Sequence, residues 1–203
     1  MRISDDRYSR DRLRLDIAMH FIRHEARTHT IRQWTGLTDD RIRKLYRSYL
    51  HGGGCRVVRH RGKSPRQSAF FLRTARLRQE AAALAGICGL LGLLEGRGRG
   101  TAAPRAPAVL RAASLCQAFE VYRAVVETPV ISFEHAVLLV GALARGAELC
   151  LASCADCRVL VIADPYALRP PLCALCETTA GPRLATCRAA PAGRARLRCA
   201  EHT

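Results

Sequence analysis

Apolar residues recur every three or four positions over most of the chain, and this spacing predicts a mostly α-helical protein. The first such stretch lies between Asp11 and Arg27, where Leu13, Ile17 and Phe21 fall on one face of a helix. We therefore expect a first helix that packs this face against the rest of the protein.

Two shorter helices are expected next. The first covers Thr30 to Thr35 and ends before Gly36. Thr38 and the two aspartates after it are typical of an N-cap and an acidic first turn, so a third helix is expected to run to about Leu50, before three glycines. Three short helices with a glycine turn before the last are typical of a helix-turn-helix, which we assign to residues 1–54.

The third helix is expected to have two different faces. Its apolar residues share the face that would pack against the first two helices: Ile42, Leu45, Tyr46 and Tyr49. Its cations Arg43, Lys44 and Arg47 point the other way, where they can reach phosphates or guanine edges. The alternative is that these cations form an ordinary solvated helix face.

The middle of the chain contains a basic loop, a long helix and a linker. The loop, Arg56 to Arg66, is either a contact to a DNA backbone or a surface connection. A core helix is expected from Gln67 to Leu94, and with the loop it makes up a region of residues 55–95. Residues 96–107 contain glycine, arginine, proline and alanine without apolar periodicity, which predicts a flexible linker.

Two further helices are expected within residues 108–151. They cover about Ser114 to Val126 and Ser132 to Leu151, and their apolar content places them in the core or against a partner. Three isolated cysteines are expected to be packed in apolar surroundings: Cys88, Cys116 and Cys150.

Two cysteine pairs follow in residues 152–180. Cys154 and Cys157 form the first Cys-x-x-Cys pair and Cys173 and Cys176 the second, with fifteen residues between the pairs. This zinc-ribbon spacing predicts one structural zinc ion per chain, with no coordination position left for a catalytic water. A disulfide framework would require an export signal, and the charged N-terminal residues offer no apolar stretch for one.

Residues 181–203 are expected to form a basic, flexible tail that can contact DNA non-specifically. Cys187, Cys199 and His202 in this tail match no standard ligand spacing, and they are either free or part of a second metal site.

The charge of the chain favours an anionic partner. Its 33 basic residues exceed its 17 acidic ones, which gives a formal net charge of +16, and nucleic acid is the simplest partner for such a protein. The longest uncharged stretch, Ala81 to Leu94, is shorter than the roughly 20 residues that a membrane-spanning helix needs. We therefore expect a cytoplasmic protein without a membrane contact.

The sequence does not favour an enzyme. It contains no phosphate-binding loop, zinc-protease motif or nucleophile elbow, and no pair of carboxylates of the kind that acid-base catalysis would require. His20, His24 and His29 lie near one another in sequence, but no carboxylate or cysteine completes a ligand set, so they are expected to be surface or core residues.

Four sequence motifs together resemble one known family. They are Gly-Leu-Thr-Asp-Asp-Arg-Ile-Arg-Lys-Leu-Tyr (Gly36 to Tyr46), Ser-Pro-Arg-Gln-Ser-Ala-Phe-Phe (Ser64 to Phe71), Val121-Tyr122-Arg123 and the four-cysteine segment. In this order they resemble the FlhC family, the C subunit of the bacterial flagellar master transcriptional activator.

This resemblance implies a transcription activator subunit. Such a subunit assembles with a smaller D subunit into a hexamer of four D and two C chains, binds and bends promoter DNA upstream of flagellar operons, and recruits RNA polymerase. It also implies that the four paired cysteines hold zinc and that the DNA contacts fall on Arg41, Arg43, Lys44 and Arg47. The alternative from another class is a zinc-dependent redox-sensing or protein-interaction module without sequence-specific DNA binding.

Overall fold

The computed structural model describes residues 3–51, 57–60, 62–94 and 108–179. These segments contain seven α-helices, one 3-10 helix and one two-stranded sheet, so the protein is mostly α-helical, as predicted. The three glycines after the third helix, the linker and the basic tail with its two cysteines and His202 lie outside the described residues. Among the helices that are described, none is long and apolar enough to cross a membrane.

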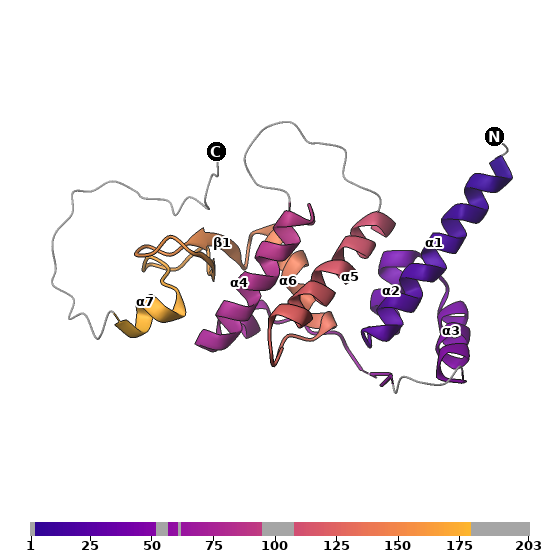
Figure 1. Ribbon diagram of the computed structural model, residues 1–203, viewed down its shortest axis with the longest axis horizontal. Coiled ribbons are helices and arrows are strands. Elements are labelled where there is room, and N and C mark those ends of the chain that lie inside the picture. Colours follow the sequence, from indigo (N-terminus) through magenta and orange to yellow (C-terminus); the bar gives the residue numbers. More distant parts are fainter. Residues whose placement is uncertain (1–2, 52–56, 61, 95–107, 180–203) are drawn as a thin grey trace.

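The molecule is elongated, with α3 (Asp39–His51) at one end and α7 (Ala174–Thr179) at the other (Figure 1). Helices α4 (Ala75–Leu90), α5 (Ala108–Val125) and α6 (Phe133–Arg145) form the body between these ends. The two candidate sites predicted from the sequence are therefore far apart along the molecule.

The first helix differs from its prediction at both ends. Helix α1 spans Ile3–Arg23, so it begins and ends earlier than the predicted range. Its N-terminal turns project beyond the body (Figure 1), and Leu13 is 38% exposed. The expectation that Leu13 packs with Ile17 and Phe21 was therefore wrong, although the other two residues are buried as predicted.

Helices α2 (Thr28–Thr35) and α3 pack against α1. Gly36 ends α2 in the left-handed conformation, at a φ of 71°, which a residue without a Cβ adopts at little cost. In α3, Ile42 and Tyr46 are buried, as the apolar spacing predicts. The Tyr46 hydroxyl donates a hydrogen bond to the carbonyl of Ala26 in the turn between α1 and α2, and it thereby joins all three helices.

An aromatic cluster connects the three N-terminal helices to the body. The ring of Phe133 in α6 meets the rings of Phe21 and Phe119 edge to face, at centroid distances of 4.9 and 5.2 Å. The neighbouring Glu134 accepts hydrogen bonds from the Arg27 N–H (2.8 Å) and the Thr30 hydroxyl (3.0 Å). A carboxylate of α6 therefore caps the start of α2, where backbone N–H groups lack partners.

The predicted continuous helix from Gln67 to Leu94 was wrong. The chain instead forms a 3-10 helix, η1 (Ser68–Leu72), followed by α4. Thr74 between them has an extended backbone, and its hydroxyl accepts a hydrogen bond from the Leu77 N–H at 3.1 Å. This N-cap starts a new helix, because a threonine hydroxyl satisfies a donor that the first turn leaves open.

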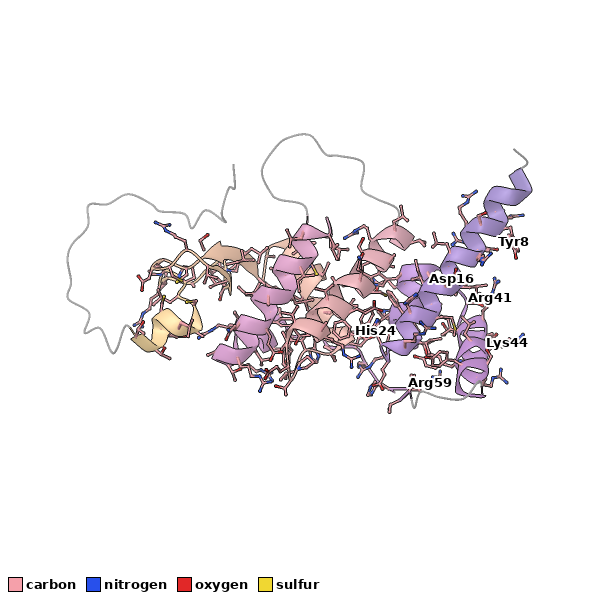
Figure 2. All side chains as sticks on the ribbon, viewed as in Figure 1. Tyr8, Asp16, His24, Arg41, Lys44 and Arg59 are labelled. Carbon is pink, nitrogen blue, oxygen red and sulfur yellow. The ribbon has the colours of Figure 1, made fainter. Side chains whose placement is uncertain are left out.

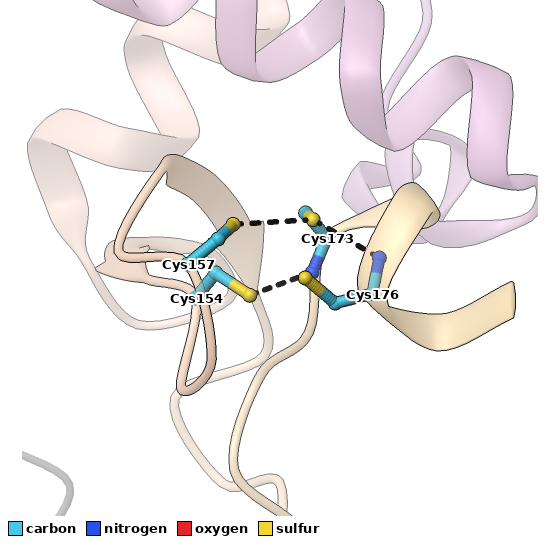
Figure 3. Close-up of side chains that lie close together, drawn as sticks. All are labelled: Cys154, Cys157, Cys173 and Cys176. Atoms are coloured by element: carbon cyan, nitrogen blue, oxygen red, sulfur yellow. Dashed lines mark hydrogen bonds between the residues drawn. The ribbon is translucent and has the colours of Figure 1, made fainter. Parts of the chain in front are cut away.

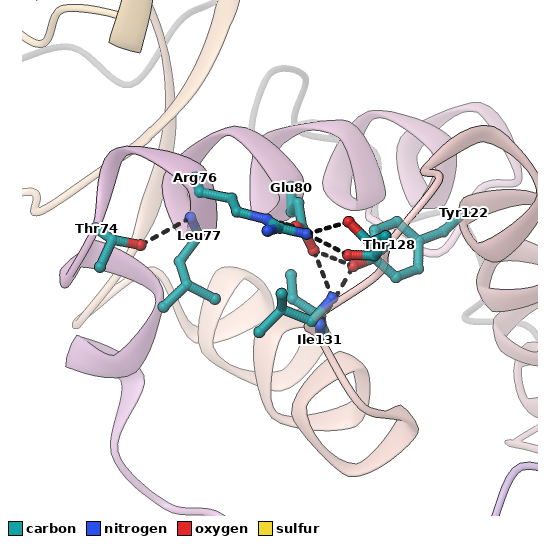
Figure 4. A network of polar contacts seen from close by, with 8 residues as sticks. Thr74, Arg76, Leu77, Glu80, Tyr122, Thr128 and Ile131 are labelled. Carbon is teal, nitrogen blue, oxygen red and sulfur yellow. Dashed lines mark hydrogen bonds and ion pairs between the residues drawn. The ribbon is translucent and has the colours of Figure 1, made fainter.

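A buried carboxylate joins α4 to α5 and to the turn that precedes α6 (Figure 4). Glu80 is 6% exposed; it accepts hydrogen bonds from the Tyr122 hydroxyl, from the Val130 N–H at 2.9 Å and from Arg76 at 2.9 Å. Burial raises the pKa of Glu80, but these hydrogen bonds outweigh burial and leave the pKa below its ordinary value. The carboxylate is therefore stabilised in its charged form.

The second half of the predicted helix from Ser132 to Leu151 was also wrong. Helix α6 ends at Arg145, where Gly146 adopts a left-handed conformation at a φ of 64°. The chain then forms β1 (Cys150–Ser153), which pairs antiparallel with β2 (Leu160–Ala163). Strand β2 packs against α4, so the small sheet is attached to the helical body.

Candidate metal centre and basic helix

Four cysteine side chains converge at the end of the molecule that carries the sheet (Figure 3). Cys154 and Cys157 lie in the loop between β1 and β2, while Cys173 and Cys176 lie at the start of α7. Their four sulfur atoms all lie within 4.8 Å of one another. The sequence prediction that these four residues come together is confirmed, and the group can hold a metal ion.

The loop between the strands is shaped by backbone hydrogen bonds. The Cys154 N–H donates to the carbonyl of Val159 at 2.8 Å, and the Arg158 N–H donates to the carbonyl of Cys154 at 3.1 Å. Arg158 has a φ of 64°, which turns the chain back into β2. A second connection, from the Ala155 N–H to the carbonyl of Pro171 (3.0 Å), brings the segment before α7 beside this loop.

The backbone also favours a thiolate at Cys154. N–H groups of Cys157, Cys173 and Asp156 point at its sulfur, and they lower the pKa of Cys154 to about 6 against the opposing effect of burial. Hydrogen bonds with the sulfurs of Cys173 and Cys157 raise the pKa of Cys176 to about 12, because they favour its protonated form. A metal ion bound among the four sulfurs would replace these hydrogen bonds, since it binds the deprotonated form of a cysteine.

Four protein ligands leave no position for a water or a substrate at a tetrahedral ion. The group can therefore hold β1, β2 and α7 together but offers no open site for catalysis. Cys154 is buried, whereas Cys157 is exposed, so one edge of the group faces solvent.

Two further features attach this region to α4. The guanidinium of Arg78 in α4 forms an ion pair with Glu177 in α7. A mostly apolar groove of about 450 Å³ lies beside this pair, between α4, β2 and the start of α7. Its apolar walls include Ala82, Ile87, Leu160, Ile162 and Leu175.

At the opposite end of the molecule, α3 presents its cations to solvent. The side chains of the four predicted DNA-contacting residues are all exposed: Arg41, Arg43, Lys44 and Arg47. Figure 2 shows Arg41 and Lys44 on α3, at the end of the molecule away from the cysteines. Arg43 forms an ion pair with Asp40 at 3.0 Å, so its charge is partly offset within its own helix.

Part of the predicted basic loop is attached to the three-helix unit. Glu25 accepts a hydrogen bond from the Val58 N–H at 3.2 Å and pairs with His60 at 2.8 Å. The guanidinium of Arg59 lies over the Tyr46 ring, 5.3 Å from its centroid. These contacts place Arg59 beside α3. No local pattern predicts them, because Glu25 precedes its partners by more than thirty residues.

The three histidines noted in the sequence take different positions. The His24 ring stacks on Phe133 and lies 3.2 Å from Glu120, and burial lowers the pKa of His24. His20 lies 3.8 Å from the same carboxylate, whereas His29 contacts Arg32. In the described segments, the four cysteines are the one group of potential ligands close enough to hold a metal ion.

The three isolated cysteines are buried, as predicted. Burial raises the pKa of both Cys88 and Cys116 to about 12, so these thiols stay protonated and behave as small apolar residues. Their chemistry therefore differs from that of Cys154.

Comparison with models of known protein families gave no match, and comparison with curated proteins gave none either.

Proposed function

We propose that this protein is a DNA-binding subunit of a transcription activator of the FlhC type, and that α3 is the helix that contacts DNA. The main support for the proposal is that α3 has one buried apolar face and one exposed basic face. Ile42 and Tyr46 fix one face against α1 and α2, while the cations of the other face are exposed. A helix held in this way can place cations against phosphates and base edges in a groove of DNA.

The overall charge supports the same proposal. A net charge of +16 favours binding to a polyanion, because each cation that meets a phosphate releases a condensed counterion. Arg59 adds a cation beside α3, in a position supported by Tyr46 and by the Thr28 hydroxyl, which accepts a hydrogen bond from Arg59 at 3.4 Å.

Zinc is the metal that we propose for the cysteine group, as one structural ion per chain. Zinc–sulfur bonds of about 2.3 Å in a tetrahedron place the sulfurs about 3.8 Å apart, and the four sulfurs here lie within 4.8 Å of one another. Cys157 and Cys173, one from each pair, are already 3.6 Å apart. Four thiolates are typical ligands of structural zinc, and the ion would hold the loop of the sheet to α7.

The resemblance to FlhC supplies the assembly that we propose. Two copies of this chain combine with four D subunits in the cytoplasm, and the complex binds and bends promoter DNA upstream of flagellar operons and recruits RNA polymerase. Two surface features could meet such partners, the exposed cations of α3 and the apolar groove beside the cysteines.

The direct test is fluorescence anisotropy of a flagellar promoter fragment, titrated with this protein purified with and without a co-expressed D subunit. Binding that is tight, specific for the promoter and dependent on the D subunit is the expected result. Weak binding that is equal on any DNA and unaffected by the D subunit would contradict the proposal.

A second candidate function is a zinc-dependent redox or protein-interaction module. It is favoured by the exposed Cys157 and by the apolar groove that adjoins the site. Hydrogen peroxide would oxidise the thiolates of Cys154 and Cys157 to a disulfide, be reduced to water, and release the metal ion. This candidate predicts metal loss at mild peroxide concentrations from a protein with little affinity for DNA, and metal retention would exclude it.

A further inference from the structure

A cleft of about 770 Å³ lies where α2, residues 62–66, α5 and α6 meet. It is separate from the cysteine group, and none of the four exposed cations of α3 lines it. Four basic side chains line it: Lys63, Arg66, Arg111 and Arg145. They come from three segments that are distant in sequence, so the fold itself brings them to one cavity.

Three of these cations, Lys63, Arg66 and Arg111, have little negative charge near them. Glu134 is the one carboxylate among the lining residues, and both of its oxygens already accept hydrogen bonds at the start of α2. Within the part of the chain that the structure describes, no carboxylate lies within ion-pair distance of Lys63, Arg66 or Arg111. Like charges in one concave site repel one another, and a bound anion removes that repulsion.

The walls of the cleft also suit a polar ligand. The Arg111 guanidinium lies over the ring of Trp34, 5.9 Å from its centroid, so this cation is held in place at the wall. The side chain of Arg145 lies close to Gly141: a Cβ added at Gly141 would be 3.4 Å from Nη1 of Arg145. The Ser64 hydroxyl is buried and has no hydrogen-bond partner among the described residues, which leaves a donor available at this wall.

We propose that this cleft binds a phosphate-bearing anion. A phosphate group offers several oxygens to cations that approach from different sides, and arginine binds it through paired hydrogen bonds. A cavity of this size falls in the range of small-molecule sites, so the phosphate can belong to a free nucleotide-sized compound. The phosphate can instead belong to the backbone of bound DNA. The proposal does not depend on α3 as the DNA-contacting helix.

The test uses Trp34, the one tryptophan of the chain, whose intrinsic fluorescence reports on the cleft wall. The full-length protein is titrated in one arm with pyrophosphate and in the other with a short DNA duplex. A saturable change in fluorescence is expected in at least one arm. Saturation with pyrophosphate identifies a free phosphate compound as a ligand, and saturation with the duplex alone identifies the DNA backbone.

The double variant Lys63→Gln/Arg66→Gln is expected to weaken this binding at least tenfold. Both side chains are exposed, so the variant keeps its fold, which circular dichroism checks. The matched control, Arg12→Gln/Arg23→Gln, removes the same charge from exposed positions on α1 and is expected to change the affinity less than twofold.

Absence of saturation in both arms would overturn the proposal, and so would an equal loss in the two double variants, which would show a general effect of net charge. Neither result tests whether α3 contacts DNA, because that contact is tested separately, by promoter titrations of variants in α3. A result that contradicts phosphate binding in the cleft can therefore be distinguished from one that contradicts the proposed function.

Discussion

The two ends of this molecule are held together by different forces. At the N-terminal end, α1, α2 and α3 are joined by buried apolar and aromatic residues such as Phe21, Ile31 and Ile42. At the C-terminal end, large apolar residues are instead exposed, among them Val159 (50%), Leu168 (102%) and Leu175 (74%). A segment with so small a core needs another source of stability, and the four convergent cysteines offer one through a metal ion.

This difference also separates the proposed roles. The apolar packing of α3 leaves cations exposed on its other face, whereas a tetrahedral ion held by the four cysteines would have no position for a substrate. We infer that the C-terminal end is a metal-stabilised structural unit and that the N-terminal end carries the DNA contact.

Loss of the metal ligands is expected to have the largest effect, and to have it at the C-terminal end alone. The double variant Cys154→Ser/Cys173→Ser is expected to lose the metal and, with it, the hydrogen-exchange protection of β1 and β2, because a preformed site rarely exists without its ion. Protection of α1 to α3 should persist. Metal content and hydrogen exchange by mass spectrometry measure both effects, with Thr179→Ala in α7 as the control. A soluble double variant with a full complement of metal would contradict the assigned site.

At the N-terminal end, a cavity in the apolar core is expected to lower the free energy of unfolding. Phe21→Ala is expected to lower the free energy of unfolding by about 3–5 kcal/mol, since it removes a fully buried ring from the aromatic cluster, and it should leave the metal content unchanged. Leu13→Ala, on an exposed part of the same helix, should cost less than about 0.5 kcal/mol. Chemical denaturation compares the two variants, and equal costs would contradict the packing described for α1.

The buried carboxylate of the body should produce a smaller, pH-dependent effect. Glu80→Gln is expected to cost about 1–3 kcal/mol at neutral pH, because it weakens the bonds from Tyr122, Arg76 and Val130. The folded-state pKa of Glu80 lies below its ordinary value of 4.5. The contribution of this carboxylate is therefore present above pH 4.5 and is lost as the pH falls through the folded-state pKa.

Denaturation between pH 3 and pH 7 measures this dependence. The loss of stability on the acid side should be smaller in Glu80→Gln than in the wild type, and Glu127→Gln at an exposed position should leave it unchanged. An identical pH profile for Glu80→Gln and wild type would show that Glu80 is not held as described.

The smallest effect is expected from a single hydroxyl in the N-terminal unit. Tyr46→Phe removes the hydrogen bond to the Ala26 carbonyl while it keeps the ring under Arg59, so it should cost about 1 kcal/mol. The control is Tyr49→Phe in the same helix, because the Tyr49 hydroxyl has no hydrogen bond to any described residue. A difference near zero between the two variants would remove the role given to the Tyr46 hydroxyl.

The sequence predicted those features that depend on local spacing. The inner face of α3 follows from the positions of Ile42 and Tyr46, and the cysteine group follows from two Cys-x-x-Cys pairs. The helix end at Gly36 was predicted for the same reason, since glycine adopts the left-handed conformation there without a steric cost.

Features that depend on distant partners were not predicted. Glu80 and Tyr122 are 42 residues apart and Glu134 and Arg27 are 107 apart, so no local pattern shows that either carboxylate is buried. The helix break at Thr74 was missed because apolar residues continue on both sides of it. The start of β1 was missed because Leu149 and Cys150 extend the apolar pattern of α6 past Gly146.

We propose that α3, at the end opposite the cysteine group, contacts DNA. The most direct test is the slope of log affinity against log salt concentration for promoter DNA, measured by anisotropy for the wild type, Arg43→Ala, Arg47→Ala and Arg169→Ala, the last an exposed arginine of the metal end. Each α3 variant is expected to weaken binding and to reduce the magnitude of the slope by about one, with Arg169→Ala unchanged. Wild-type affinity and slope in both α3 variants would contradict the claim.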